Sequence, residues 1–183
     1  ALEDALVNVG FYFLTGHGES SVGSTGRTAY SRIRNLLRDA NYDIRDSLVL
    51  VTEKVPEDCD LLVVPGPKTR LYPTEVNAIR SHFEGGQFAG IFLMDPGYRT
   101  GLEPMLESWS VVLNGDLVIE QSAVGKTLGM DYSMPAVATY AVHPVTEKHE
   151  GLMTVFQFAQ SLGRRGTVPN VKHTKLPMTT SSS

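Results

Sequence analysis

The fold is decided by Leu61-Leu62-Val63-Val64, an apolar run closed by Pro65-Gly66-Pro67. Two runs of the same kind flank it in the chain: Val9-Gly10-Phe11-Tyr12-Phe13-Leu14 before it and Phe88-Ala89-Gly90-Ile91-Phe92-Leu93-Met94 after it. Short apolar runs that end at Gly and Pro predict strands buried on both faces, as in a parallel sheet. A further strand is predicted within residues 42–50.

Amphipathic segments separate these strands. Between Arg27 and Ala40, apolar residues recur at helical spacing and predict a helix. A second helix is predicted from Pro73 to Gly85-Gly86, because Pro suits the first turn and Glu75 suits the positive helix N-terminus. A short helix is predicted over 102–109. Strands alternating with helices predict a doubly wound α/β domain, with a mainly parallel sheet covered by helices on both faces.

The second half of the chain has weaker signals. Asn114-Gly115 lies between the apolar runs 111–113 and 117–119, which favours a hairpin or else a bend between a helix and one edge strand. A strand is predicted over 137–142, whereas 152–162 fits either a helix or a strand. From Gly163 onward Gly, Pro, Thr and Ser dominate, so we divide the chain into a domain, 1–162, and an irregular segment or linker, 163–183.

Composition limits the functional classes. The chain has 183 residues, a net charge of −4 and one cysteine. A globular domain of this charge without a basic block is not expected to bind nucleic acid, and one cysteine cannot form an intrachain disulfide. No zinc-ligand spacing is present, so we expect neither a metal nor a cofactor. No apolar stretch is long enough to span a bilayer. A start at Ala1 without a signal peptide, and a Thr/Ser end, suggest a domain of a longer protein.

Candidate site residues follow the apolar runs. The carboxyl ends of parallel strands share one edge of a sheet, where ligands of open α/β folds bind. We therefore predict that this edge lines a pocket for a small molecule or saccharide, formed by Gly16, His17, Gly18, Glu19, Pro65, Gly66, Lys68, Asp95 and His143. The alternative for His17 and His143 is that each bonds to backbone groups and fixes a loop.

Three other motifs point less clearly to chemistry. Gly16-His17-Gly18-Glu19-Ser20-Ser21 is similar to the start of a dinucleotide fingerprint, but Ser21 replaces the third glycine. Gly125-Lys126-Thr127 has the end of a phosphate loop without its first glycine, which favours a surface turn. Cys59 precedes a predicted strand, at the end opposite to the expected site, and is expected to be a small buried hydrophobe.

The ordered set of motifs resembles the auxiliary component of an uncharacterised ABC transport system, the gliding-motility GldG-like family. The residues that carry the resemblance are 11–19, Pro65-Gly66-Pro67-Lys68, Glu75 before Gly85-Gly86, Leu93-Met94-Asp95-Pro96 and His143-Pro144-Val145-Thr146. The resemblance implies an extracytoplasmic, periplasmic domain of a membrane-anchored bacterial protein that works beside an ABC permease and ATPase. The family is also similar to the GIFT domain of intraflagellar transport proteins and to flavodoxin-like, class I glutamine-amidotransferase-like folds, for which saccharide binding has been suggested.

The expected position of an enzymatic nucleophile is the turn after Val64. There the sequence places Gly66 between two prolines, and so departs from a true amidotransferase. A non-catalytic binding or scaffolding domain is therefore the favoured interpretation. The alternative is a hydrolase or amidotransferase that uses His17 or His143 as base and an unrecognised nucleophile such as Ser20 or Ser21.

Overall fold

A computed structural model describes residues 9–23, 30–51, 54–86, 88–127, 129–149 and 151–178. The chain forms two compact units, Ala1–Met105 and Leu106–Ser183, called here the first and the second unit. This division lies well before the predicted boundary at 162/163, which stays a prediction. Every helix in the described ranges is too short or too polar to cross a membrane.

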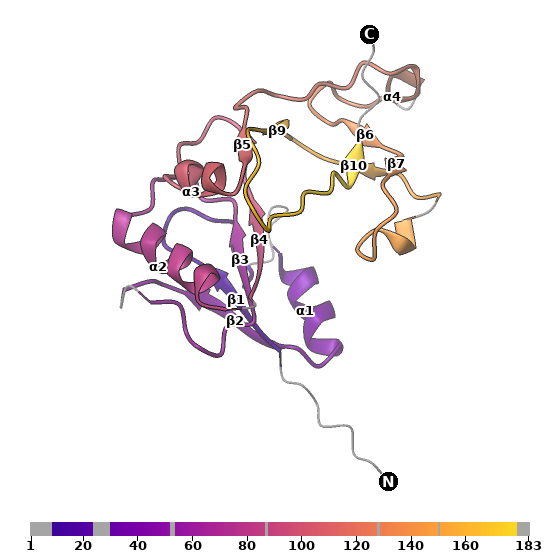
Figure 1. Cartoon of the computed structure of the whole chain (residues 1–183). Coiled ribbons are helices and arrows are strands. Elements are labelled where there is room, and N and C mark those ends of the chain that lie inside the picture. Colours follow the sequence, from indigo (N-terminus) through magenta and orange to yellow (C-terminus); the bar gives the residue numbers. More distant parts are fainter. Residues whose placement is uncertain are drawn as a thin grey trace. The chain divides into compact units, whose positions relative to one another are not determined.

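The first unit is built on a four-stranded parallel sheet. Its strands are β1 (Gly10–Leu14), β2 (Asp43–Leu48), β3 (Leu61–Pro65) and β4 (Ala89–Leu93), in the order β2-β1-β3-β4. Two helices, α1 (Ser31–Asp39) and α2 (Pro73–Glu84), lie on opposite sides of the sheet (Figure 1). The prediction of an α/β fold with a mainly parallel sheet is confirmed. The predicted start of the first helix, Arg27, lies outside the described residues.

The two central strands are buried on both faces, as their uninterrupted apolar sequences require. Phe13 and Val63 pack with Ile44 and Val22 in one core cluster, against which Leu37 of α1 also packs. Because side chains alternate along a strand, their neighbours in β1 and β3 face the other side of the sheet. These neighbours are also buried, as are Val76, Ala78 and Ile79 of α2.

Strand β4 differs from its prediction. Its sequence, Ala-Gly-Ile-Phe-Leu, is as apolar as that of β3, but Ile91 is 44% exposed and Leu93 37% exposed. The reason is its place in the sheet, because β4 pairs with β3 on one side and is the last strand in the order. An apolar run alone therefore did not distinguish a central strand from an edge strand.

Helix α3 (Glu103–Ser108), within which the two units divide, confirms the helix predicted over 102–109. Its start is stabilised by Glu103. One carboxylate oxygen of Glu103 accepts the Thr100 backbone N–H at 2.8 Å, and the other accepts the Gly101 N–H at 2.8 Å. Both N–H groups belong to the turn that leads into the helix, and a carboxylate in the first helical turn also suits the positive end of the helix dipole.

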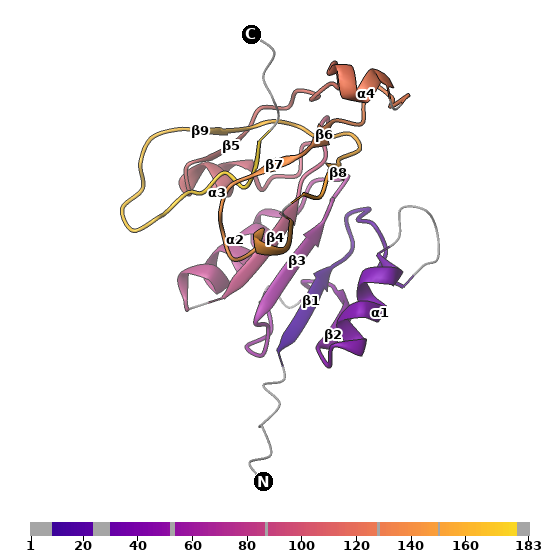
Figure 2. The ribbon, with the colours of Figure 1, turned by 90° about the vertical axis from the view of Figure 1, so that its right-hand side faces the viewer.

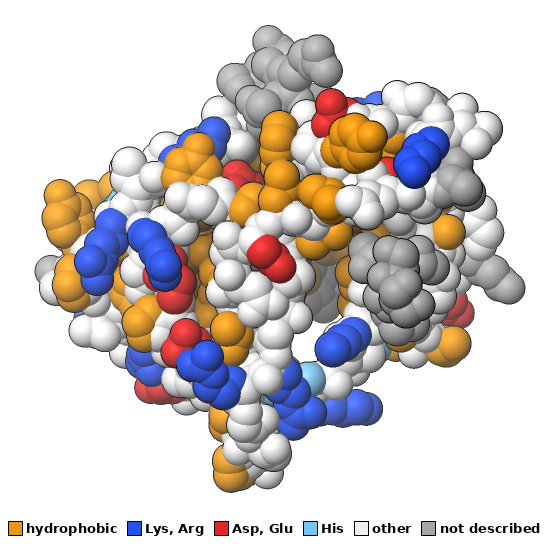
Figure 3. Space-filling model, turned by 90° about the horizontal axis from the view of Figure 1, so that it is seen from above, with side chains coloured by type: hydrophobic (Ala, Val, Ile, Leu, Met, Phe, Trp, Pro, Cys, Tyr) orange, Lys and Arg blue, Asp and Glu red, His pale blue; other side chains and the backbone are white. Residues whose placement is uncertain are grey.

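Among its described residues, the second unit contains three small antiparallel ladders (Figure 2). Strand β5 (Val111–Leu113) pairs with β9 (Leu162–Arg164), β6 (Ala136–Val137) with β8 (Thr154–Val155), and β7 (Thr139–Tyr140) with β10 (Pro177–Met178). Short helical turns occur at α4 (Ala123–Thr127) and η1 (Glu147–His149). Several large hydrophobic side chains of this unit are exposed. Figure 3 shows the molecule from above, with hydrophobic side chains in orange.

Predictions for the second unit needed several corrections. Of the two alternatives at Asn114-Gly115, the hairpin is wrong, because β5 pairs with residues 162–164 and not with 117–119. The strand predicted over 137–142 is two short strands that pair with different partners. Within 152–162 the structure has strand β8 rather than a helix. The segment after Gly163 is largely irregular, but it contains the end of β9 and strand β10.

Candidate functional site

The loops that follow β1 and β3 lie side by side at the carboxyl edge of the sheet. The His17 carbonyl accepts the backbone N–H of Lys68 at 2.8 Å and that of Thr69 at 3.0 Å, and the Ser20 N–H donates to the Pro65 carbonyl at 3.0 Å. Parallel pairing of β1 with β3 is what brings the two loops together. The sequence prediction that these segments meet at one edge is therefore supported for residues 16–20 and 65–69.

Glycines on either side of His17 set the course of the first loop. Gly16 has φ +120° and Gly18 has φ +77°, conformations that residues with a Cβ rarely adopt. A Cβ at Gly18 would also lie 3.3 Å from the Cβ of Lys68. The two glycines thus let the loop turn tightly enough to carry the His17 side chain inward, where it is only 6% exposed.

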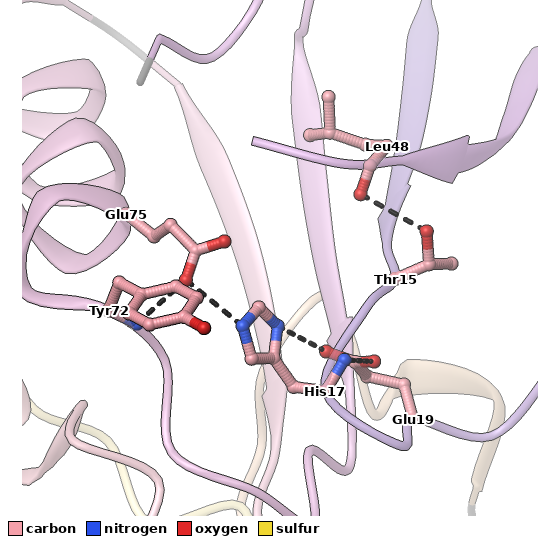
Figure 4. Close-up of polar contacts among 6 residues, drawn as sticks. All are labelled: Thr15, His17, Glu19, Leu48, Tyr72 and Glu75. Carbon is pink, nitrogen blue, oxygen red and sulfur yellow. Dashed lines mark hydrogen bonds and ion pairs between the residues drawn. The ribbon is translucent and has the colours of Figure 1, made fainter. Parts of the chain in front are cut away.

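The His17 imidazole lies between two buried carboxylates (Figure 4). Its Nε2 lies 3.0 Å from Glu75 Oε2, and its Nδ1 lies 3.5 Å from Glu19 Oε1. The other oxygen of Glu19 accepts the His17 backbone N–H at 2.6 Å. The contact with Glu75 is thus the close one, whereas Nδ1 and Glu19 Oε1 are buried without a hydrogen bond.

Glu75 reaches His17 from the first turn of α2. Pro73 begins the helix, and the Glu75 side chain turns back to accept the Tyr72 backbone N–H at 2.7 Å. The predicted positions of Pro73 in the first turn and of Glu75 at the helix N-terminus are both confirmed. However, the sequence predicted for Glu75 only a role at the helix dipole, and it did not predict the contact with His17. The sequence feature that could have predicted this contact is the position of Glu75 in the first turn of the helix that follows the β3 loop.

The loop after β3 contains a buried turn, and the loop after β4 contributes an exposed acid, Asp95. Pro65, Gly66 and Pro67 are buried, and Gly66 has φ +71°. A Cβ placed on Gly66 would lie 3.2 Å from Asp95 Oδ2, which brings the loop after β4 to the same edge. This edge therefore gathers residues from three successive strand ends, as the sequence predicted for Gly66 and Asp95.

Tyr30 also lies at this edge, near Asp95 and Ser20, and the sequence did not predict this position. Burial raises the pKa of the Tyr30 phenol above its ordinary value, the nearby Asp95 carboxylate raises it further, and a hydrogen bond with the Ser20 side chain acts in the opposite direction. The Ser20 hydroxyl is thus bonded to a phenol. The printed polar contacts of the His17 ring are with Glu19 and Glu75 rather than with Ser20.

Burial divides the predicted site residues into two groups. His17, Pro65 and Gly66 are buried, and the Glu19 side chain is only 2% exposed. The residues open to solvent are Gly16, Gly18, Lys68 and Asp95. The second group is the part of this edge that solvent reaches, whereas the first group shapes the loops that present it.

Two further residues were singled out in the sequence, His143 and Cys59. His143 belongs to the second unit, where its Nδ1 accepts the Val145 backbone N–H at 3.2 Å, as the loop-fixing alternative expected. Cys59 is a free, fully buried thiol, and burial raises its pKa to about 12. In the part of the chain that the structure describes, no three acidic, His or Cys side chains form a group able to hold a metal.

Comparison with known proteins bears on the fold. The structure is similar to a solved structure described as the mmIFT52 N-terminal domain. The TM-score is 0.65 at 14% sequence identity, and the aligned region covers 85% of this chain and 68% of that one. No protein-family model and no curated protein matches the chain. At this level of identity the likeness shows a shared fold and nothing more.

Proposed function

We propose that the chain is a non-catalytic binding or scaffolding domain of an ABC-transporter auxiliary subunit of the GldG-like type. In this proposal it lies on the extracytoplasmic, periplasmic side of a bacterial inner membrane, with the membrane anchor in segments outside this chain. Its partners would be the ABC permease and ATPase subunits. The ordered motifs given above are the basis for this assignment.

The turn after β3 is the observation that best supports a domain without catalytic activity. Enzymes with a nucleophile elbow present Ser or Cys at a strand-to-helix turn of this kind. Here Gly66 holds that turn at φ +71°, between two buried prolines. In addition, the His17 side chain is buried at 6% exposure, which leaves the imidazole poorly placed to take a proton from a substrate.

The finer fold assignment is also a proposal. The order β2-β1-β3-β4 is the same as the first four strands of the flavodoxin-like order 2-1-3-4-5. We assign the first unit to this class, in which the class I glutamine-amidotransferase-like folds also belong. In such sheets the β1/β3 junction is a topological switch point, where ligands bind.

A small ligand, such as a saccharide, would bind at this junction through the exposed group of residues. Lys68 offers a cationic donor, Asp95 offers carboxylate acceptors, and Gly16 and Gly18 allow close approach to the backbone. A sugar hydroxyl both donates and accepts hydrogen bonds, so paired donors and acceptors suit it. His17 would act only by holding the loop.

The transporter assignment is tested by affinity purification of the full-length protein from native membranes. We expect permease and ATPase subunits to co-purify in amounts close to that of the protein. A matched preparation in which the extracytoplasmic domain is deleted should lose them. Consistent absence of transporter subunits from the first preparation would refute the assignment, whatever the ligand of this domain is.

The ligand proposal is tested by a thermal-shift screen of this chain against monosaccharides and oligosaccharides. A ligand at 100 times its dissociation constant stabilises a protein by about 2.7 kcal/mol, which is several degrees in Tm for a domain of this size. The shift should disappear in Lys68→Ala and Asp95→Asn, because both residues are exposed and neither change disturbs the core. Lys175→Ala is the matched control. A shift that both site variants retain would exclude this edge as the site.

A further inference from the structure

The turn that follows β5 contains the only Asn-Gly pair in the sequence, Asn114-Gly115. Both residues are exposed, and Gly115 has φ +68°. Because glycine has no Cβ, its backbone nitrogen can come close to the side-chain carbonyl carbon of the preceding asparagine. Asparagine is among the thermolabile residues, and this neighbour makes Asn114 the position most prone to lose its side-chain amide.

Loss of the amide requires water and no other reactant. The Gly115 nitrogen attacks Cγ of Asn114, so that an N–Cγ bond forms while the Cγ–Nδ2 bond breaks. The proton of the Gly115 N–H ends on the departing amide nitrogen, which leaves as ammonia. Water then opens the cyclic imide at one of its two carbonyl carbons. The product is an aspartate or an isoaspartate at position 114, and either one carries a new negative charge.

The folded chain occupies both nitrogens that take part in this reaction. Asn114 Nδ2 donates to Ser161 Oγ at 2.7 Å, and the Gly115 N–H donates to Gln160 Oε1 at 3.1 Å. The attacking nitrogen and the departing nitrogen are thus bonded to the same segment, 160–161. This segment leads directly into β9, which pairs with β5. The reaction therefore requires the segment to leave the turn, which makes its rate depend on local opening of the β5/β9 ladder.

The product cannot restore these contacts. The Ser161 hydroxyl accepts from Asn114 Nδ2 and donates to Asp116 Oδ2 at 2.7 Å. A carboxylate at position 114 has no N–H to donate, and the one hydroxyl proton of Ser161 cannot serve two carboxylates. Hydrogen bonds from Ser161 hold the pKa of Asp116 below its ordinary value, so Asp116 is charged at neutral pH and repels a second carboxylate at the same hydroxyl.

We propose that Asn114 is a modification site, at which spontaneous deamidation is limited by the contact with residues 160–161 and, once complete, weakens the pairing of β5 with β9. The closed ladder protects the amide, and loss of the amide favours the open ladder. Each conversion therefore makes the change in this part of the second unit permanent. The proposal is independent of the function proposed above.

The first test is incubation of the full chain at pH 8, with deamidation at Asn114 followed by peptide mass spectrometry. Ser161→Ala and Gln160→Ala should each speed the conversion at least fivefold, and unfolding in urea should speed it further. Gln157→Ala, an exposed glutamine of the same unit, is the matched control and should convert at the parental rate. Equal rates in the parent, in both contact variants and in urea would refute the protection by residues 160–161. An intact Asn114 in the unfolded chain would refute the modification site itself.

The second test concerns the effect of the product. Asn114→Asp creates one product directly, and hydrogen exchange of the backbone amides in β5 and β9 should then be at least fivefold faster than in the parent. Asn170→Asp adds the same charge at another exposed position of the second unit and should leave this exchange unchanged. Parental exchange in Asn114→Asp would refute the weakening of the ladder, whatever the rate of deamidation.

Discussion

Glu75 joins the helix α2 to the loop after β1: its Oε2 atom lies 3.0 Å from His17 Nε2 and also accepts the Tyr72 N–H at 2.7 Å. Both side chains are buried. One carboxylate therefore caps a helix and pairs with an imidazole from a different strand end. The pair connects the two loops at the sheet edge to the helix that covers the sheet.

Removing His17 should destabilise the first unit strongly. In His17→Ala, the buried Glu75 carboxylate would lose the imidazole nitrogen that lies 3.0 Å away, and leaving a buried polar group unpaired costs about 1–3 kcal/mol. Urea denaturation measures the loss. Lys68→Ala, in the same region but exposed, should change stability by less than about 0.5 kcal/mol. Equal stabilities for the two variants would show that the His17 network has no structural role.

Gly66→Ala should be destabilising for two separable reasons. The φ of +71° costs a residue with a Cβ about 1–2 kcal/mol, and the new methyl group would lie 3.2 Å from Asp95 Oδ2. Gly97 is a matched control, since it has φ +84° and none of the described atoms lies within 4 Å of a Cβ built there. Gly66→Ala should therefore lose more stability in thermal denaturation than Gly97→Ala. The opposite order would exclude a close contact between Gly66 and Asp95.

Cys59 should be inert in the folded protein. The thiolate is the reactive form, and burial, followed by the nearby Asp58 and Asp60 carboxylates, raises the pKa of Cys59 to about 12. At pH 8 we expect no alkylation by iodoacetamide over hours, and complete alkylation once the chain is unfolded in guanidinium. Mass spectrometry distinguishes the two results. Rapid labelling of the native protein would mean that this part of the first unit opens readily.

Glu103 should make stability depend on pH. Burial acts to raise its pKa, but hydrogen bonds from the Thr100 and Gly101 backbone outweigh this effect and lower the pKa in the folded protein. A lowered folded pKa adds stability above the unfolded value, near 4.5, and this contribution is lost as the pH falls through the folded pKa. Glu103→Gln should thus cost about 1 kcal/mol at pH 7. The difference from the parent should shrink toward pH 3, and a constant difference would contradict this assignment.

The sequence predicted the first unit better than the second, for a physical reason. In the first unit, continuous apolar runs such as 61–64 can be satisfied only by burial on both faces, and glycines and prolines mark where they end. In the second unit, long-range contacts overrode local signals. Asn114 Nδ2 donates to Ser161 Oγ at 2.7 Å, and the Ser161 N–H donates to Asp116 Oδ1 at 2.8 Å, so this turn is fixed by a distant segment.

The candidate site was also predicted only in part. Positions after apolar runs correctly brought Gly16, Lys68 and Asp95 to one sheet edge. The sequence could not show that His17 is turned inward, because its partner Glu75 comes from a helix and contributes no local pattern. Burial, rather than residue type, separates the residues that face solvent from those that hold the loops.

The strand order described above also has a consequence for how the chain folds. Every pairing in the four-stranded sheet joins distant residues: Gly10 with Asp43, Phe11 with Leu61, and Leu61 with Ala89. No hairpin of this sheet can form early as a local nucleus, so long loops must close before the first ladder bond is made. The sheet is therefore expected to form late and cooperatively, and a chain released before residue 93 lacks the end of its last strand.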